Sequence, residues 1–400
     1  MKSFLRLLLI TIFISSVTVT YAQKVKRITP TPPMGWNSWN AYKKKKVNEQ
    51  VIYKTIDLMV SDGYKAAGYN YVIIDGGWRG DKLDNKGRIT VDTIKFPHGI
   101  KAMADYAHSK GLKFGLHVTP GTQDCGGDEV GMYGHEEANL KQFEYWGLDI
   151  LKIDRCQMNG ASDNWDEEAT REVYLKWSKL LSHASRPILF SISAYVYRPW
   201  YPRYCNIART TGDLWGLSRS HFDGDQHSIM KIADLNNECA DFAGDGYWND
   251  PDMLVVGNPV LTMDEQKTQF ALWCIMTSPL MMGNVLNETS PEVIDLLTNK
   301  MAIRVNQDTT EQGRRIFRRS IVGAGNEMWL KHLNDGGVAV VLLNRSDEAK
   351  SQNLYFEDIK LSDHVKVYDI FGKKSMGTMS EKISVSLDKH ACSFFILHDN

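Results

Sequence analysis

The stretch LDILKIDRC, residues 148–156, holds a short apolar run that ends in an aspartate. Ile150, Leu151 and Ile153 supply most of the run, and Asp154 closes it. A short apolar run of this kind predicts a buried strand. A carboxylate at the end of a buried strand is costly unless it is paired or used. We therefore expect a strand with a functional acid at its carboxyl end.

Similar runs lie on both sides of this one, and amphipathic stretches separate them. That alternation is typical of βα units around a parallel sheet. The expected strands are 35–39, 71–75, 113–118, 150–154, 188–193, 207–213, 246–250 and 279–282. Eight strands separated by helices over roughly 270 residues predict a (β/α)8 or TIM barrel.

Helical signals fill several of the gaps between these strands. Thr262 with Glu265 forms a capping-box pattern, and Ser290 before Pro291 is a cap followed by a proline in the first turn. Apolar residues at helical spacing mark further helices. These periodic segments are 52–60, 100–107 and 173–181.

The pattern changes from about Ile316 onward, where strands and turns replace helices. Residues 334–337, Asn-Asp-Gly-Gly, favour a tight turn between two apolar runs. The expected strands are 328–333, 338–343, 365–371, 383–387 and 392–397. We predict a C-terminal antiparallel β-sandwich over 309–400, after a catalytic barrel over 23–308.

The composition is that of a globular chain without a basic field. Of 400 residues 43% are hydrophobic and 24% charged, and 47 Lys plus Arg against 48 Asp plus Glu leave a formal net charge of -1. Phosphate backbones and anionic lipid surfaces attract proteins with a strong positive charge. We therefore expect no nucleic-acid partner.

The N-terminus has the features of an export signal. Lys2 and Arg6 precede an apolar run from about Leu7 to Val19, and small residues flank Tyr21. A membrane anchor is the alternative, but spanning a bilayer takes ~20 apolar residues. We expect a signal peptide over 1–22, cleavage after Ala22, no membrane span, and a periplasmic or secreted protein.

Six cysteines occur in the chain, and an oxidising compartment would permit disulfides among them. Cys125 and Cys156 follow two expected strand ends and are candidates for one bridge, the alternative being two free buried thiols. The chain contains no CxxC or HExxH pattern. No zinc site or other metal site is expected.

Acids recur where expected strands end: Asp75, Asp154, Asp213 and Asp250 each close a run. Catalytic groups of such barrels gather at the carboxyl ends of the strands. Two carboxylates about 5 Å apart would support retaining glycoside hydrolysis. The alternative for each acid is strand-end capping or turn formation.

Tryptophans near the same ends favour a sugar ligand, because pyranose rings stack their C–H faces on aromatic rings. A buried core position is the alternative for each of them. They are Trp36, Trp39, Trp78, Trp200, Trp215 and Trp248.

Four motifs make the chain resemble glycoside hydrolase family 27. They are TPPMGWNSWN at 31–40, LKIDRC at 151–156, RTTGD at 209–213 and WNDPDM at 248–253. The similarity continues through 134–149 and 306–315, and so covers almost all of the chain after the signal. This family contains α-galactosidases and α-N-acetylgalactosaminidases, which need no cofactor.

The resemblance implies a role for individual residues. Asp154 matches the nucleophile and Asp213 the general acid/base. Lys152 and Arg209 match residues that bind sugar hydroxyls, and their charge should lower the pKa of the nucleophile. The remaining matches are Trp39 as the aromatic platform, Asp75 as the first acid of a pair, Met253 as a wall residue, and Cys125 with Cys156 as a disulfide.

Other positions depart from the α-galactosidase pattern and concern the glycone. Gly76 stands where many members carry a second acid that contacts the hydroxyls identifying galactose, so a hydrogen bond is lost and space is left. His117 replaces a usual tyrosine and is either a pocket donor or a structural histidine.

Ser193 replaces a glutamate that contacts the sugar 2-hydroxyl, so the resemblance implies that Ser193 lies in the substrate-binding pocket and that its smaller side chain leaves room there. The α-N-acetylgalactosaminidases also carry serine there, although Val196 is larger than the alanine they pair with it. Cys205 matches a half-cystine whose usual partner position is Ile192, so Cys205 is either free or paired anew, with Cys239 as a candidate.

The leading hypothesis is a retaining exo-hydrolase of terminal α-galactoside-like sugars in oligo- or polysaccharides. The sister specificities are α-N-acetylgalactosaminidase, β-L-arabinopyranosidase and isomaltodextranase. A carbohydrate-binding protein without catalysis is the non-enzyme alternative, and the presence of both Asp154 and Asp213 argues against it. A metal-assisted barrel enzyme would instead lose activity on chelation.

Overall fold

The computed structural model describes residues 26–156, 166–214, 216, 221–316 and 325–400. The expected signal peptide and Trp215 therefore lie outside the described residues. Eight parallel strands form one sheet, in the order β10-β1-β2-β5-β6-β7-β8-β9. They are β1 (Met34–Asn37), β2 (Tyr71–Ile74), β5 (Lys113–Val118), β6 (Ile150–Asp154), β7 (Leu189–Ser193), β8 (Ile207–Arg209), β9 (Trp248–Asp250) and β10 (Leu280–Met282).

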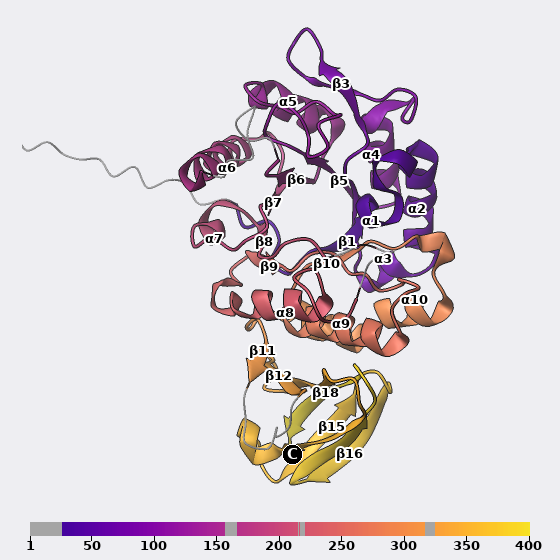
Figure 1. The fold of residues 1–400 in the computed structure, drawn as a ribbon, viewed down its shortest axis with the longest axis vertical. Coiled ribbons are helices and arrows are strands. Elements are labelled where there is room, and N and C mark those ends of the chain that lie inside the picture. Colours follow the sequence, from indigo (N-terminus) through magenta and orange to yellow (C-terminus); the bar gives the residue numbers. More distant parts are fainter. Residues whose placement is uncertain (1–25, 157–165, 215, 217–220, 317–324) are drawn as a thin grey trace, which may run out of the picture.

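The sheet curls until its two edge strands approach each other (Figure 1). The N–H of Leu254, which follows β9, donates to the carbonyl of Met281 in β10 at 2.8 Å. Leu254 also forms a parallel bridge with Met282. All eight expected strands are present, which confirms the TIM barrel prediction.

Three expected strands were too long at their carboxyl ends, one of them, 71–75, by a single residue. Residue 39 lies in a helix because the Asn37 side chain accepts from the Trp39 N–H at 2.9 Å and caps that helix. The strand expected to end at Asp213 ends at Arg209 instead. The Thr210 hydroxyl donates to the Asn236 side chain at 2.7 Å, so the chain turns from the sheet there.

Helices cover the outside of the barrel. The structure confirms helices at each of the five predicted segments, including the capping box of Thr262 and the Ser290 cap. The α-helices are α1 (Ser38–Lys46), α2 (Glu49–Ser61), α3 (Tyr64–Ala67), α4 (Gly99–Ser109), α5 (Glu136–Trp146), α6 (Glu167–Ser182), α7 (Tyr201–Tyr204), α8 (Ile229–Asn237), α9 (Met263–Ile275), α10 (Pro291–Leu297) and α11 (Lys300–Gln307). The shorter elements are the 3-10 turns η1 (Ala240–Phe242), η2 (Leu286–Glu288) and η3 (Phe356–Ile359), and the hairpin of β3 (Arg79–Leu83) with β4 (Ile89–Val91).

Alternation along the strands decides which side chains reach the barrel interior. Ile150 of β6 packs in a cluster with Tyr71, Ile73, Leu189 and Ile207, whereas Leu151 and Ile153 pack in the larger core. Successive side chains of a strand point to opposite faces. Lys152 and Asp154 therefore share the inward face of Ile150.

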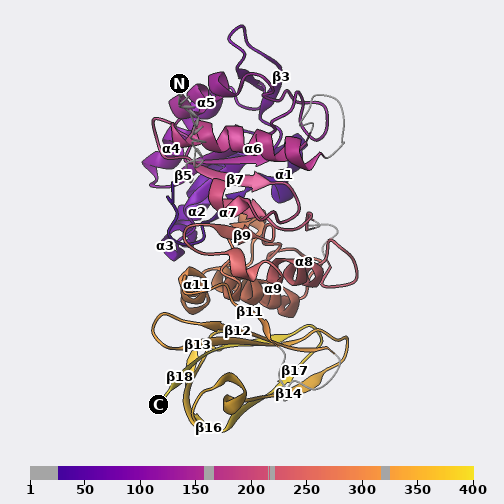
Figure 2. The same cartoon turned by 90° about the vertical axis from the view of Figure 1, so that its left-hand side faces the viewer.

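The C-terminal part is an antiparallel sheet in the order β11-β12-β13-β18-β15-β16, with the separate pair β14-β17. Figure 2 shows α8, α9 and α11 between this sheet and the barrel. The strands are β11 (Arg314–Ile316), β12 (Asn326–His332), β13 (Val338–Asn344), β14 (Lys350–Tyr355), β15 (His364–Asp369), β16 (Lys374–Ser380), β17 (Lys382–Leu387) and β18 (Cys392–Asp399).

Strand β13 shows why this sheet stays attached to the barrel, since all of its residues are buried. Val340 and Leu342 pack in the core that includes residues of β14 and β17. Val341 and Leu343, on the other face, pack in the same core as α9. A strand that is covered on both faces needs a continuous apolar run. Within the described residues, no helix has the length and apolar character needed to cross a membrane.

Candidate active site

The carboxyl ends of the barrel strands surround a pocket of about 270 Å³. Its walls combine carboxylates, lysines and aromatic rings, a composition suited to a polar ligand with apolar faces. The pocket is lined by Trp39, Asn40, Lys43, Lys44, Asp75, Gly76, His117, Asp124, Cys125, Lys152, Asp154, Tyr195, Asp213, Leu214, Gly216, Asp252 and Met253.

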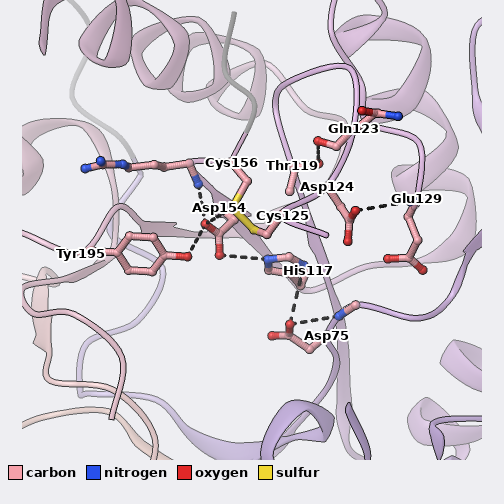
Figure 3. The surroundings of a disulfide bond; sticks show 12 residues. Asp75, His117, Thr119, Gln123, Asp124, Cys125, Glu129, Asp154, Cys156 and Tyr195 are labelled. Atoms are coloured by element: carbon pink, nitrogen blue, oxygen red, sulfur yellow. Dashed lines mark hydrogen bonds and ion pairs between the residues drawn. A yellow bond between two sulfur atoms is a disulfide. The ribbon is translucent and has the colours of Figure 1, made fainter. Parts of the chain in front are cut away.

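Asp154 lies at the end of β6 with both oxygens hydrogen-bonded (Figure 3). Its Oδ1 accepts from the Arg155 N–H at 2.7 Å and from the Tyr195 hydroxyl at 2.6 Å. Its Oδ2 lies 3.1 Å from the His117 Nε2. This carboxylate is held in one orientation, as a nucleophile must be.

The surroundings of Asp154 keep it ionised although it is buried. Burial alone would raise its pKa, but the hydrogen bond and charge of His117, the charge of Lys152 and the Tyr195 hydroxyl outweigh burial and lower the pKa. Burial and the nearby Asp154 raise the pKa of Tyr195, so its hydroxyl remains a donor. An ionised carboxylate with little hydration is a ready nucleophile.

Asp75, the residue after β2, contacts Lys152, Asn37 and His117. Its Oδ2 accepts from the Lys152 Nζ and the Asn37 Nδ2, both at 3.0 Å. Its Oδ1 lies 3.7 Å from the His117 Nδ1, so His117 stands between Asp75 and Asp154. Burial would raise the pKa of Asp75, but His117, Lys152 and Asn37 together lower it.

Asp213 has a different environment at the pocket mouth. It lies four residues beyond β8, and 57% of its side-chain surface is exposed, against 6% for Asp154. The Arg209 guanidinium contacts its Oδ1 at 3.2 Å and Asp252 Oδ1 at 3.0 Å. An exposed acid can exchange protons with a leaving group and with water.

Asp252 is the buried member of that second group. Burial raises its pKa, Arg209 opposes this effect, and the nearby Asp213 and Asp250 add to it. Its Oδ2 accepts from the Leu214 N–H at 2.8 Å, which fixes the chain next to Asp213. The pocket thus holds a buried, ionised carboxylate at Asp154 and an exposed one at Asp213.

The predicted site residues divide into those that line this pocket and those behind it. Trp39, Gly76, His117, Lys152 and Met253 line it with Asp75, Asp154 and Asp213. Ser193 is fully buried and Arg209 almost so, and neither lines the pocket. Tyr195, two residues after Ser193, lines the pocket instead and donates its hydroxyl to Asp154.

The cysteine predictions have separate outcomes. Cys125 and Cys156 form a disulfide, as expected, which joins the loop after β5 to the residues after Asp154 (Figure 3). Cys205 and Cys239 are both free and buried, so the new pairing considered for them is not formed. Within the described residues, one grouping of metal-ligand types occurs, Cys125, Asp154 and Cys156, and its two sulfurs are already bonded to each other.

The tryptophans are mostly core residues. Trp36 and Trp78 are completely buried and Trp248 is 1% exposed, whereas Trp39 is partly exposed and lines the pocket. Only Trp39 of these can meet a ligand in the pocket. The core alternative therefore holds for the other three, and Trp200, which is partly buried, also packs against the main core.

Sequence reasoning missed several pocket residues. Asp252 lies inside the WNDPDM motif, and Tyr195 lies two residues beyond Ser193, so both were close to positions already chosen. Both residues have positive φ values, 87° for Asp252 and 62° for Tyr195. Residues other than glycine rarely adopt this conformation. Lys43 and Lys44 lie in a run of four lysines that carries no motif, and no role was predicted for them from the sequence.

The contacts of His117 predict a pH effect. Asp154 must be ionised to act as the predicted nucleophile, so a lowered pKa would extend activity to lower pH. In His117→Leu, burial is less opposed, so the pKa of Asp154 rises and the acidic limb of the kcat/KM profile moves to higher pH. The measurement is kcat/KM as a function of pH for both proteins.

His183→Leu is the matched control, because His183 is exposed at the end of α6. Its acidic limb should coincide with that of the original protein. An acidic limb that stays in place in His117→Leu, in a variant with an unchanged Tm, would contradict the role given to His117.

Comparisons with known proteins agree along the whole length of this architecture. Residues 31–308 match the family described as alpha galactosidase A, and residues 323–397 match the alpha galactosidase C-terminal beta sandwich domain. An alpha-galactosidase of Cyamopsis tetragonoloba is 37% identical over 373 residues, which cover 92% of this chain and 86% of that protein. Alpha-galactosidase A of Cellvibrio japonicus is 35% identical over 360 residues, covering 88% and 85%.

A solved structure has a similar fold. The crystal structure of alpha-galactosidase I from Mortierella vinacea superposes with a TM-score of 0.85 at 30% identity, covering 93% of this chain and 98% of that one.

Proposed function

The chain belongs to the α-galactosidase family of glycoside hydrolases, and on that premise we propose that it removes terminal α-galactosyl-like sugars with retention of anomeric configuration. One observation carries this proposal. Asp154, buried and ionised, shares a pocket with the exposed Asp213. A nucleophile and an acid/base with such different environments are what a double displacement requires.

In the first step, an Asp154 oxygen attacks the anomeric carbon while the bond from that carbon to the leaving oxygen breaks. Asp213 gives its proton to the leaving oxygen, which departs as an alcohol. The sugar is then held as an ester of Asp154. Arg209 stabilises the Asp213 carboxylate that forms, through its contact at 3.2 Å.

In the second step, Asp213 takes a proton from water, and the water oxygen attacks the anomeric carbon from the side the leaving group vacated. The ester bond breaks, which returns Asp154 to its ionised form. Two inversions at one carbon give net retention. The hydrogen bonds from Tyr195, Arg155 and His117 stabilise Asp154 each time it leaves as a carboxylate.

The pocket also supports a choice among the related glycones. Trp39 and Met253 offer apolar surface, and Lys152 offers a donor for hydroxyls. Ser193 lies behind the lining, so the room it was expected to leave for an acetamido group is not part of the pocket. This favours a galactoside over the N-acetylated sugar.

A panel of aryl glycosides tests the glycone, with α-galactoside, α-N-acetylgalactosaminide, β-L-arabinopyranoside and α-glucoside as substrates. We expect the α-galactoside to have a higher kcat/KM than the α-glucoside by at least ~10²-fold, because an inverted hydroxyl leaves buried polar groups unpaired. Proton NMR of the first-formed sugar should show the α anomer. A β anomer would exclude the double displacement, and inactivity on the whole panel would exclude the function.

We also propose that the mature chain begins after Ala22 and acts outside the cytoplasm. The Cys125–Cys156 disulfide supports an oxidising compartment. The barrel is assigned to 23–308 and the β-sandwich to 309–400. Mass spectrometry of the exported protein tests the cleavage site.

A further inference from the structure

Most charged groups of the pocket have partners on the protein. Lys152 pairs with Asp75 at 3.0 Å, and Arg209 pairs with Asp252 at 3.0 Å. Lys44 forms ion pairs with Asp124 and Asp128. Charges that are paired in this way attract a charged ligand only weakly, because each is already neutralised by its partner.

Lys43 differs from these groups. Its Nζ donates to the neutral Asn40 Oδ1 at 3.3 Å and lies 4.7 Å from the centre of the Trp39 ring. Among the described residues, no carboxylate lies within ion-pair distance of it. Loss of hydration lowers the pKa of Lys43 even though Asp75, Asp252 and Asp213 act to raise it. The ammonium therefore lacks a close anionic partner.

The backbone at Lys43 has an unfavourable conformation. Its φ is 49° and ψ is -172°, an interruption inside helix α1. A positive φ is unfavourable for a residue with a side chain and is common at ligand sites. Lys43 is exposed like Lys45 and Lys46, but of these three only Lys43 lines the pocket.

Gly76 lies on the same wall of the pocket, against Lys44 and Trp39. A Cβ at Gly76 would lie 3.4 Å from the Lys44 side chain and 3.5 Å from Trp39, so the glycine faces the same wall. Its neighbour Gly77 has φ +102°, and a Cβ there would lie 2.7 Å from the Lys44 backbone. The turn after Asp75 thus packs closely on α1 and contributes no side chain beyond that of Asp75.

From this juxtaposition we propose that the preferred glycone carries an oxyanion, a sulfate ester or a carboxylate, which binds Lys43 beside Trp39 and Gly76. The inference rests on the proposed galactosidase-like function and specifies its substrate class. A charge-assisted hydrogen bond to the oxyanion would give the ammonium a close anionic partner. Gly76 contributes no carboxylate to this wall, so no charge at that position repels the added group.

The test compares kcat/KM for aryl α-galactoside with the values for its 6-sulfate, its 4-sulfate and the aryl α-galacturonide. The sulfates and the uronate separate the two sources of the oxyanion. We expect at least one anionic substrate to exceed the neutral one by about 10- to 100-fold, the value of a hydrogen bond to a charged group. Added salt should reduce this ratio.

Lys43→Gln should reduce the anionic-to-neutral ratio by about 10-fold or more, because the amide cannot supply the charge. Lys43→Arg should keep a ratio above 1. Lys45→Gln, in the same lysine run but outside the pocket lining, is the matched control and should keep the original ratio.

A neutral substrate that is hydrolysed at least as well as every anionic one overturns this inference and leaves the proposed function intact. A ratio that Lys43→Gln does not change overturns it as well. Inactivity on all four substrates overturns the proposed function and this inference together.

Discussion

Asp154→Ala is expected to lower kcat on an aryl α-galactoside by more than ~10³-fold, because the covalent route is lost. The pocket loses the carboxylate that accepts hydrogen bonds from Tyr195, Arg155 and His117. Binding should survive, because Trp39, Lys152 and Asp75 remain in the lining. The loss should therefore appear in kcat and not in KM.

Azide gives this variant a distinctive readout. A small anion can enter the space left by the carboxylate and attack the anomeric carbon directly. One displacement instead of two then yields a β-galactosyl azide from an α-galactoside. Its formation would identify Asp154 as the nucleophile independently of the rate.

Asp105→Ala serves as the control, since Asp105 is an exposed aspartate of α4 that pairs with Lys101. Its kcat should equal that of the original protein. Near-normal turnover by Asp154→Ala, with the fold intact by circular dichroism, would remove Asp154 from the nucleophile role.

Asp213→Ala is expected to show a loss that depends on the leaving group. A sugar alcohol departs poorly without a proton, so hydrolysis of an oligosaccharide should fall by about 10²- to 10⁴-fold. An acidic nitrophenol needs little protonation, so formation of the ester on Asp154 should slow far less. The measurement is kcat/KM for substrates that share the glycone and differ in the pKa of the aglycone.

The exposure of Asp213 strengthens this expectation. With 57% of its side-chain surface open, its removal creates no cavity and leaves Asp252 still paired with Arg209 at 3.0 Å. The folded structure should survive the change, with an unaltered Tm. Equal losses across all aglycones would show that Asp213 acts on something other than the leaving oxygen.

Several features follow from short-range patterns in the chain. The apolar run of Ile150–Asp154 is a strand, and Thr262 with Glu265 caps α9, because both depend on residues a few positions apart. Inward orientation of Lys152 and Asp154 also follows, because side chains alternate along a strand. Eight such strands leave few arrangements other than a closed barrel.

Strand ends were harder to predict because they depend on distant partners. The expected strand through Asp213 stops at Arg209, where Thr210 bonds to Asn236 of α8. Trp39 belongs to a helix because of the Asn37 cap. Propensity contains no information about which of these competing partners is within reach.

Residue order thus accounts for the barrel, the C-terminal sheet and the acids at the strand ends, since all of these arise from local periodicity and from recognisable motifs. Packing accounts for the rest of the pocket. Tyr195 bonds to Asp154 from 41 residues away, and Ser193 is withdrawn behind the lining. Lys43 reaches the ligand side only because α1 breaks there and packs on Gly76 and Gly77. These contacts join segments far apart in the chain, and their free energy exists only once the barrel has closed.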